Sequence, residues 1–177
     1  MVLLRAQSPE DVGPNQSDII CKWEYNGYRL PTEAEWEFAC RAGTTTALNN
    51  GMEITNTSDQ SAPVLDLNVD PIAWYYANGA ASHPVGQKQA NGLGLYDMHG
   101  NAAEWCWDLY DDTLMVQFPK TTVTDPRGQT ERGIYRAMRG GSWRNTGKRV
   151  RSAYRDRQII FLQGGYQVGF RIARNAE

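Results

Sequence analysis

The sequence predicts an irregular α+β domain with short strands, few helices and much irregular loop. Residues 31–43 have the composition and end signals of one strong helix, and several short stretches further along alternate apolar and polar side chains as strands do. Two long polar stretches, 44–70 and 109–133, have no period and are expected to be loops. Because the chain has 177 residues and no internal repeat, we expect residues 1–177 to form a single domain.

The helix expected within residues 31–43 has clear start and end signals. Thr32 can cap the first turn, and Glu35, three residues later, completes a capping box. Gly43 can take the left-handed conformation that often ends a helix. The apolar face of this helix is expected to consist of Ala34, Trp36, Phe38, Ala39, Cys40 and Ala42.

Four strands are expected in the second half of the chain. They are residues 103–108, 135–139, 149–155 and 167–173. Successive side chains of a strand point to opposite faces of its sheet. Two sets of side chains should therefore share a face: Glu104, Cys106 and Asp108 in the first strand, and Val168, Phe170 and Ile172 in the last.

Charge and cysteine content exclude some classes of function. The net charge is −2 and the pI is about 5.7, so no overall positive field attracts nucleic acid, and no nucleic-acid partner is expected. No apolar run approaches the roughly 18 residues of a membrane-spanning helix. Three widely spaced cysteines exclude a disulfide framework and a cysteine zinc site. We expect buried free thiols, with a Cys40–Cys106 bridge as the alternative, and the redox compartment stays undecided.

Hard oxygen donors near residue 101 suggest one metal site. Asn101 and Glu104, with carbonyl groups of nearby turns, could hold a structural calcium ion. The alternative is that both side chains only hydrogen-bond the turn and a neighbouring strand. His83 and His99 are sixteen residues apart and form neither HExxH nor His-x-His, so we expect turn residues rather than a pair of metal ligands. No other cofactor is expected.

Residues 139–172 have strand-like ends and no consistent period between them. A fixed frame around an unpatterned segment predicts a surface that recognises a ligand. The segment contains six cations within fourteen residues: Arg144, Lys148, Arg149, Arg151, Arg155 and Arg157. Arg151, Arg155 and Arg157 are expected to point outward from a strand, as part of a mixed recognition surface, whereas Arg144 and Lys148 are not. The apolar run 159–162 is either a short buried strand or a set of exposed anchor residues.

Several longer phrases carry a family resemblance. They are Tyr28-Arg-Leu-Pro-Thr-Glu-Ala-Glu-Trp-Glu-Phe-Ala39, His83-Pro-Val-Gly86, Gly92-Leu-Gly-Leu-Tyr-Asp-Met-His-Gly-Asn101 followed by Glu104-Trp105, Arg139-Gly-Gly-Ser-Trp143, Arg151-Ser-Ala153 and Gly169-Phe-Arg171. As an ordered set they resemble the formylglycine-generating-enzyme (sulfatase-modifying factor) family. The resemblance implies a C-type-lectin-like fold. Family members usually have a longer part before residue 22, so we expect a minimal or truncated version of the domain.

The same resemblance bears on enzymatic activity. Catalytic members of the family oxidise a substrate cysteine with a copper-associated cysteine pair that lies shortly after the Gly-Gly-Ser motif. The matching residues 143–151 contain no cysteine, and neither asparagine nor valine can replace a thiolate. We therefore expect no enzymatic activity. The alternatives are a formylglycine-generating or other metal-dependent family enzyme, and a structural domain that assembles with a further N-terminal piece.

Another branch of the family fits the segment better. Variable proteins of diversity-generating retroelements are similar in their C-terminal Gly-Gly-Ser-Trp to Gly-Phe-Arg segment, which adenine-directed mutagenesis diversifies. The resemblance implies a non-enzymatic, receptor-type binding protein, with residues 139–172 as the variable segment and a protein or cell-surface molecule as ligand. Admissible variable positions are Arg144, Asn145, Thr146, Arg149, Tyr154, Asp156, Arg157, Ile159, Ile160, Phe161, Leu162 and Tyr166. By analogy, the protein is expected at the cell surface or secreted.

Overall fold

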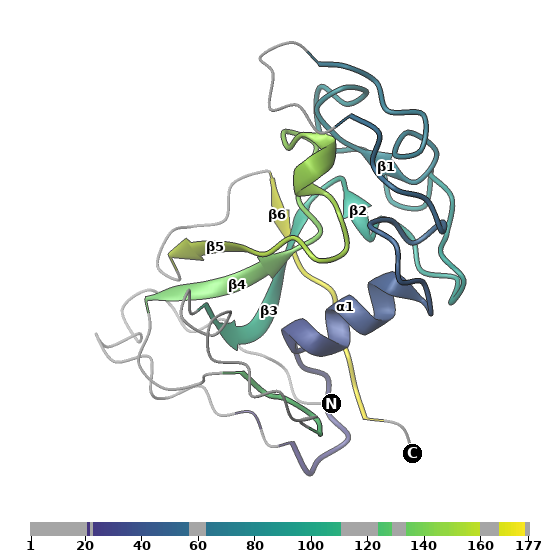
Figure 1. Ribbon diagram of the computed structural model, residues 1–177. Coiled ribbons are helices and arrows are strands. Elements are labelled where there is room, and N and C mark those ends of the chain that lie inside the picture. Colours follow the sequence, from purple (N-terminus) through teal and green to yellow (C-terminus); the bar gives the residue numbers. More distant parts are fainter. Residues whose placement is uncertain are drawn as a thin grey trace.

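The chain folds around a four-stranded sheet with one helix packed on it, as the computed structural model shows (Figure 1). The structure describes residues 21, 23–56, 63–110, 124–128, 134–159 and 167–175. The elements are α1 (Glu33–Arg41), β1 (Ala73–Trp74), β2 (His99–Gly100), β3 (Ala103–Leu109), β4 (Tyr135–Arg139), the 3-10 helix η2 (Gly147–Arg149), β5 (Asp156–Ile159) and β6 (Val168–Gly169). Short strands, one α-helix and long loops make this an α+β fold, as predicted.

The sheet places the end of the chain beside its middle. Its strand order is β5-β4-β3-β6, with β3 antiparallel to β4, β4 antiparallel to β5, and β3 parallel to β6. β1 and β2 form a separate parallel pair. An isolated antiparallel bridge joins Arg29 to Ala173, so the chain leading into α1 lies against the C-terminal segment.

The helix begins as its sequence predicts. The Thr32 side chain accepts a hydrogen bond from the Glu35 backbone N–H at 3.1 Å, and the Glu35 carboxylate accepts one from the Thr32 N–H at 2.8 Å. At the other end, Ala42 already has a left-handed conformation with φ of 49°, one residue earlier than expected. The expected apolar face is wrong at Phe38, which is 76% exposed, because the stripe against the sheet is Trp36 and Cys40.

The strand predictions are right for the first half of the sheet and wrong for the second. β3 and β4 lie where expected, and Glu104, Cys106 and Asp108 are all buried on one face of β3. Residues 149–155 do not form the predicted strand but continue η2 into turns, and the strand begins only at Asp156. Local hydrogen bonds explain this, because the N–H groups of residues 149 and 150 bond to carbonyls three residues back.

The last predicted strand is shortened to β6, and two of the three side chains expected to share a face lie on the outside. Phe170 and Ile172 are exposed, at 69% and 56%. Arg171, between them, turns inward and forms an ion pair with Glu104 on β3. A buried carboxylate without a cationic partner costs free energy, so Arg171 faces Glu104. Because side chains alternate along the segment, Phe170 and Ile172 then lie on the outside.

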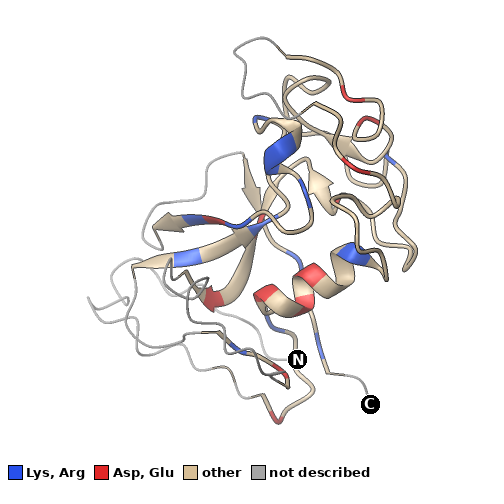
Figure 2. Cartoon of the chain, in the orientation of Figure 1, with Lys and Arg blue, Asp and Glu red and all other residues tan. Residues whose placement is uncertain are grey.

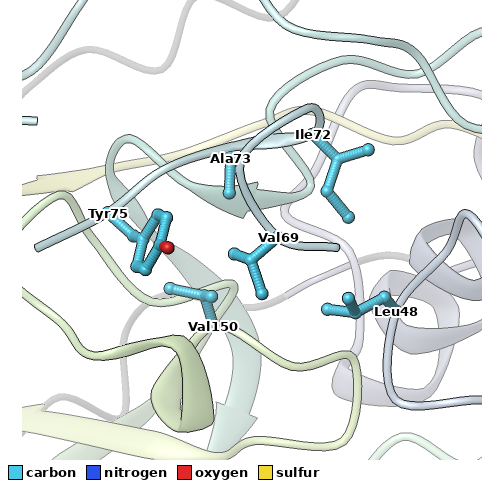
Figure 3. Close-up of a cluster of buried hydrophobic side chains, with 6 residues drawn as sticks. All are labelled: Leu48, Val69, Ile72, Ala73, Tyr75 and Val150. Carbon is cyan, nitrogen blue, oxygen red and sulfur yellow. The ribbon is translucent and has the colours of Figure 1, made fainter. Parts of the chain in front are cut away.

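Two apolar clusters hold the domain together. One joins α1 to the sheet through Trp36, Cys40, Met98, Cys106 and Ala137. The other fills the loop-rich lobe and consists of Leu48, Val69, Ile72, Ala73, Tyr75 and Val150 (Figure 3). Val150 follows η2, so the second cluster fastens the C-terminal segment to the loops.

The cysteines are free thiols, so the alternative of a Cys40–Cys106 bridge is wrong. Burial raises the pKa of Cys40 to about 11 and that of Cys106 well above its usual range. Both therefore stay protonated at neutral pH and act as small apolar side chains. Within the described ranges, no helix has the length and apolar character needed to cross a membrane.

Candidate recognition surface

A buried arginine fixes the start of the C-terminal segment. The Arg139 side chain, at the end of β4, is 1% exposed and lies between two carboxylates of α1, 3.5 Å from Glu33 and in an ion pair with Glu37. Its guanidinium also donates to the carbonyl of Ser152 at 2.9 Å. Ion pairs of this depth require both partners, so Arg139 ties the helix, the sheet and the turn after η2 into one frame.

Two glycines follow Arg139, and the second permits a close backbone contact. Gly141 has a φ of 67°, and a Cβ built on it would lie 2.5 Å from the carbonyl oxygen of Arg149. Gly140 has a φ of 86° and faces the Trp36 ring. Because only glycine fits both the conformation and the space at position 141, the Gly-Gly pair brings η2 against the end of β4.

The next turn depends on the side chain of Asn145. The Asn145 amide oxygen accepts hydrogen bonds from the Ser142 N–H at 2.7 Å and from the Ser142 hydroxyl at 3.0 Å. The backbone carbonyl of Asn145 accepts from the N–H of Tyr76 at 3.0 Å, which connects the turn to the loop lobe. Asn145, predicted as a variable position, thus contributes its amide group to the frame.

A buried histidine fixes the end of η2. His99 Nε2 accepts the N–H of Asn49 at 3.2 Å, so the ring proton is on Nδ1, which donates to the Val150 carbonyl at 2.6 Å. Burial lowers the pKa of His99 to about 4, which keeps the ring neutral. His99 is fully buried in β2, whereas His83 stacks on the Trp74 ring at 3.7 Å. The two histidines have separate structural partners.

The remaining predicted positions form the outer side of the segment. Arg144, Arg149 and Arg157 are exposed, as is the neighbouring Lys148 (Figure 2). Thr146, Tyr154, Asp156 and Ile159 are half-buried. Ile160, Phe161, Leu162 and Tyr166 lie outside the described residues, so the alternatives for the run 159–162 stay open. The exposed positions lie on η2, the preceding turn and β5.

The cations point as predicted only in part, since Arg157 is exposed as expected but others are not. Arg155 turns inward and holds the Glu33 carboxylate with two hydrogen bonds of 2.8 and 2.6 Å. Arg144 and Lys148, expected to point elsewhere, are exposed instead. The Tyr110 ring lies within 4.9 Å of the Arg155 guanidinium and 5.2 Å of that of Arg157. Arg155 is therefore held by Glu33, and Arg157 contacts the Tyr110 ring.

The predicted calcium ligands lie in two different hydrogen-bond groups. The Glu104 carboxylate accepts from the Trp36 indole N–H at 2.7 Å and from two nitrogens of Arg171. The Asn101 amide oxygen accepts the N–H of His83 at 2.9 Å. Over the described part of the chain, no group of three or more His, Cys, Asp or Glu side chains could hold a metal ion. Calcium binding by Asn101 and Glu104 stays a prediction.

The contacts that build the frame were not predicted from the sequence. Arg139, Glu33 and Ser152 lie in the family phrases, but no contact between them was expected, although Arg139 follows Ala137 on the core-facing side of its strand. A charged residue at such a position is a signal, because a buried cation needs a partner. The identity of that partner could not be read from the sequence, since Glu33 and Glu37 lie about a hundred residues earlier.

Asp108 gives this frame a dependence on pH. Its carboxylate accepts the N–H of Glu33 at the start of α1, at 2.8 Å, and burial raises its pKa from 3.8 to about 6. Between pH 4 and pH 6 the folded state therefore binds more protons than the unfolded state. The contribution of protonated Asp108 to the free energy of unfolding is complete below pH 4 and is lost as the pH rises through 6. Relative to the parent chain, Asp108→Asn should gain about 3 kcal/mol of unfolding free energy between pH 4 and 7, measured by urea denaturation. A difference that does not change with pH would contradict this assignment.

These features define a class of protein: a C-type-lectin-like fold of the formylglycine-generating-enzyme type, with a fixed frame beneath an exposed C-terminal segment. The chain belongs to the family described as "Sulfatase-modifying factor enzyme 1-like domain", whose model matches residues 10–176. Family and fold agree with the resemblance found in the sequence.

Comparison with known proteins finds two similar solved structures and a similar formylglycine-generating enzyme. The structure of Treponema denticola variable protein 1 is similar with a TM-score of 0.70 and 34% identity, over 86% of this chain and 49% of that one. PvdO from Pseudomonas aeruginosa is similar with a TM-score of 0.65 and 27% identity, over 84% and 53%. The formylglycine-generating enzyme of Thermomonospora curvata is 38% identical over 136 residues, 72% of this chain and 42% of the enzyme. The chain thus spans about half the length or less of these relatives.

Proposed function

We propose that the protein is a non-enzymatic ligand-binding protein whose C-terminal segment, residues 139–172, displays a diversified recognition surface. The observation that carries this proposal is the division of the segment into two kinds of position. Arg139, Gly141 and Ser152 are buried in contacts with α1, η2 and the loop lobe. Arg144, Arg149 and Arg157 are exposed on the outer side. A surface of this kind can change its side chains while the frame stays fixed.

Similarity to a variable protein supports the proposal. Treponema denticola variable protein 1 resembles this chain in fold and at 34% identity, over 86% of this chain and 49% of the variable protein. Exposed Arg144, Arg149 and Arg157 are among the positions admissible for adenine-directed variation. The ligand would be a protein or another cell-surface molecule, contacted by Tyr154 together with Arg144, Asp156 and Arg157.

An enzyme of the formylglycine-generating kind is the second candidate, because a relative of that name is 38% identical. The chemistry of that kind needs an accessible thiolate. Cys40 and Cys106 are buried, and their raised pKa values disfavour the thiolate form. Residues 143–151 contain no thiol. Oxygen consumption by the copper-treated protein in the presence of a cysteine-containing peptide would favour this candidate over the proposal.

Sequencing the genomic DNA around the gene tests the diversification. The proposal predicts a near-copy of the codons for residues 140–171, differing at adenines, beside a reverse-transcriptase gene. It also predicts that the differing codons include those of Arg149 and Arg157 and leave Arg139 unchanged. A locus without such a copy would end the retroelement part of the proposal.

The division between surface and frame predicts a difference in stability. Arg149→Ser should change the unfolding free energy by no more than about 0.5 kcal/mol, because the side chain is exposed. Arg155→Ser should lower it by about 2 kcal/mol, because it leaves the Glu33 carboxylate without a partner it now holds with two hydrogen bonds. Urea denaturation of both variants measures the difference. Equal losses in the two variants would show that Arg149 belongs to the frame.

A further inference from the structure

The charge of the chain is divided very unevenly along the sequence. Residues 144–157 contain six cations and one acid, Asp156, and therefore carry a net charge of +5. Because the whole chain carries −2, the remaining residues carry −7. A third of the cations of the chain thus lie within fourteen residues. This segment is basic, whereas the rest of the chain is acidic.

Most of this positive charge lies on the outer side of the segment. Arg144, Lys148, Arg149 and Arg157 are exposed, whereas Arg155 is neutralised by Glu33. The carboxylate of Asp156 accepts the N–H of Arg157 at 2.8 Å. Figure 2 shows basic residues on η2 and on β5, and Arg155, directly before β5, lies against the acidic first turn of α1. Together, Arg144, Lys148, Arg149 and Arg157 are the basic surface of the segment, on η2, the turn before it and β5.

Exposed apolar side chains lie on loops that adjoin η2. Methyl groups of Ile54 and Val69 lie 3.8 and 3.7 Å from a Cβ built on Gly147, so the loops that carry them adjoin η2. Two residues before each, Met52 and Leu67 are exposed. A partner that reaches from the basic surface to these loops would meet cations first and apolar groups at the rim.

Two kinds of partner could use a basic surface, and the structure favours one. A nucleic acid is a long, uniform polyanion, and beyond the segment it would meet the −7 of the remaining chain. An acidic protein segment is short enough to stay on the basic surface, and its apolar residues can contact Met52 and Leu67. Half-buried Tyr154, with the Arg151 guanidinium 5.4 Å from its ring, adds an aromatic contact of the kind common in protein interfaces.

We propose that the recognition surface of this chain binds an acidic protein segment, in which Asp and Glu residues are mixed with apolar ones. The inference rests on the proposed function and names the chemistry of its ligand. Arg144, Arg149 and Arg157 contact the carboxylates, and the loops around Met52 and Leu67 contact the apolar side chains. Arginine suits this task because its planar guanidinium binds a carboxylate through two parallel hydrogen bonds.

Selection from a displayed library of random peptides, each about 12 residues long, tests the inference with the full chain as bait. The expected result is enrichment of peptides with several Asp or Glu residues, and binding that falls about tenfold between roughly 50 and 500 mM NaCl. Failure to enrich any peptide, or enrichment of neutral or basic ones, would overturn the inference. Tighter binding of a single-stranded DNA of roughly 20 nucleotides than of the selected peptides would also overturn it, in favour of a nucleic acid.

Two matched double variants separate this inference from the proposed function. Arg144→Ser with Arg149→Ser removes two charges from the recognition surface, and Arg127→Ser with Arg174→Ser removes two exposed charges elsewhere. The first pair should weaken the selected peptides at least about tenfold, and the second less than about twofold. Acidic peptides that bind both variants equally would contradict recognition by this segment. Peptides that need the segment but are not acidic would contradict only the ligand chemistry proposed here.

Discussion

Replacing Arg139 with methionine is expected to lower the free energy of unfolding by about 3–5 kcal/mol. Arg139 is fully buried and lies between the carboxylates of Glu33 and Glu37, and methionine keeps much of its volume without its charge. The loss comes from the two carboxylates of α1, which keep only Arg155 and Arg41 as partners, together with the Ser152 carbonyl that loses a donor. Urea denaturation at pH 7 measures it.

Arg41→Met is the matched control, because Arg41 also pairs with Glu37 but at the surface of the same helix. Exposed pairs of this kind contribute less than about 1 kcal/mol. If the two variants lose similar amounts, Arg139 does not organise the frame in the way described.

Gly141→Ala is expected to cost about 2–4 kcal/mol and to move η2. A left-handed conformation costs an L-residue other than glycine about 1–2 kcal/mol, and here the new methyl group would also lie 2.5 Å from the Arg149 carbonyl oxygen. Relief requires η2 to move away from β4. The variant should therefore lose ligand binding even under conditions where most of it is folded.

Gly43→Ala separates the two contributions. Gly43 has a φ of 91°, but a Cβ built there meets nothing within 4 Å. Only the conformational cost should appear, about 1 kcal/mol, and ligand binding should not change. Equal effects in the two glycine variants would mean that the contact between Gly141 and η2 has no role in holding the segment.

Local signals in the sequence were sufficient for α1, β3 and β4. The capping box of Thr32 and Glu35 located the start of α1, because a cap is made by residues only three positions apart. Alternation located β3 and its buried residues Glu104, Cys106 and Asp108. The Gly-Gly-Ser-Trp and Gly-Phe-Arg phrases mark the predicted ends of the recognition segment, and the family that they indicated is confirmed by the match over residues 10–176.

Contacts between residues far apart in the sequence determine the features that could not be predicted from it. The alternation of residues 149–152 fits a strand equally well, but Val150 packs against loop residues and Ser152 bonds to the carbonyl of Ala47. Phe38 occupies a helical position that suits an apolar face, yet the sheet lies on the side of Trp36 and Cys40. The direction of Arg155 depends on Glu33, more than a hundred residues earlier. Such partners are fixed by the tertiary fold and leave no local pattern.

A library in which Arg144, Arg149, Tyr154, Asp156 and Arg157 vary together tests most directly whether a fixed frame carries a replaceable recognition surface. Each displayed member can be scored for protease resistance and for binding to a panel of unrelated proteins. The account predicts that most members stay folded, within about 1 kcal/mol of the parent chain, and that different members bind different proteins. A library in which most members unfold, or in which folded members bind nothing, would contradict it.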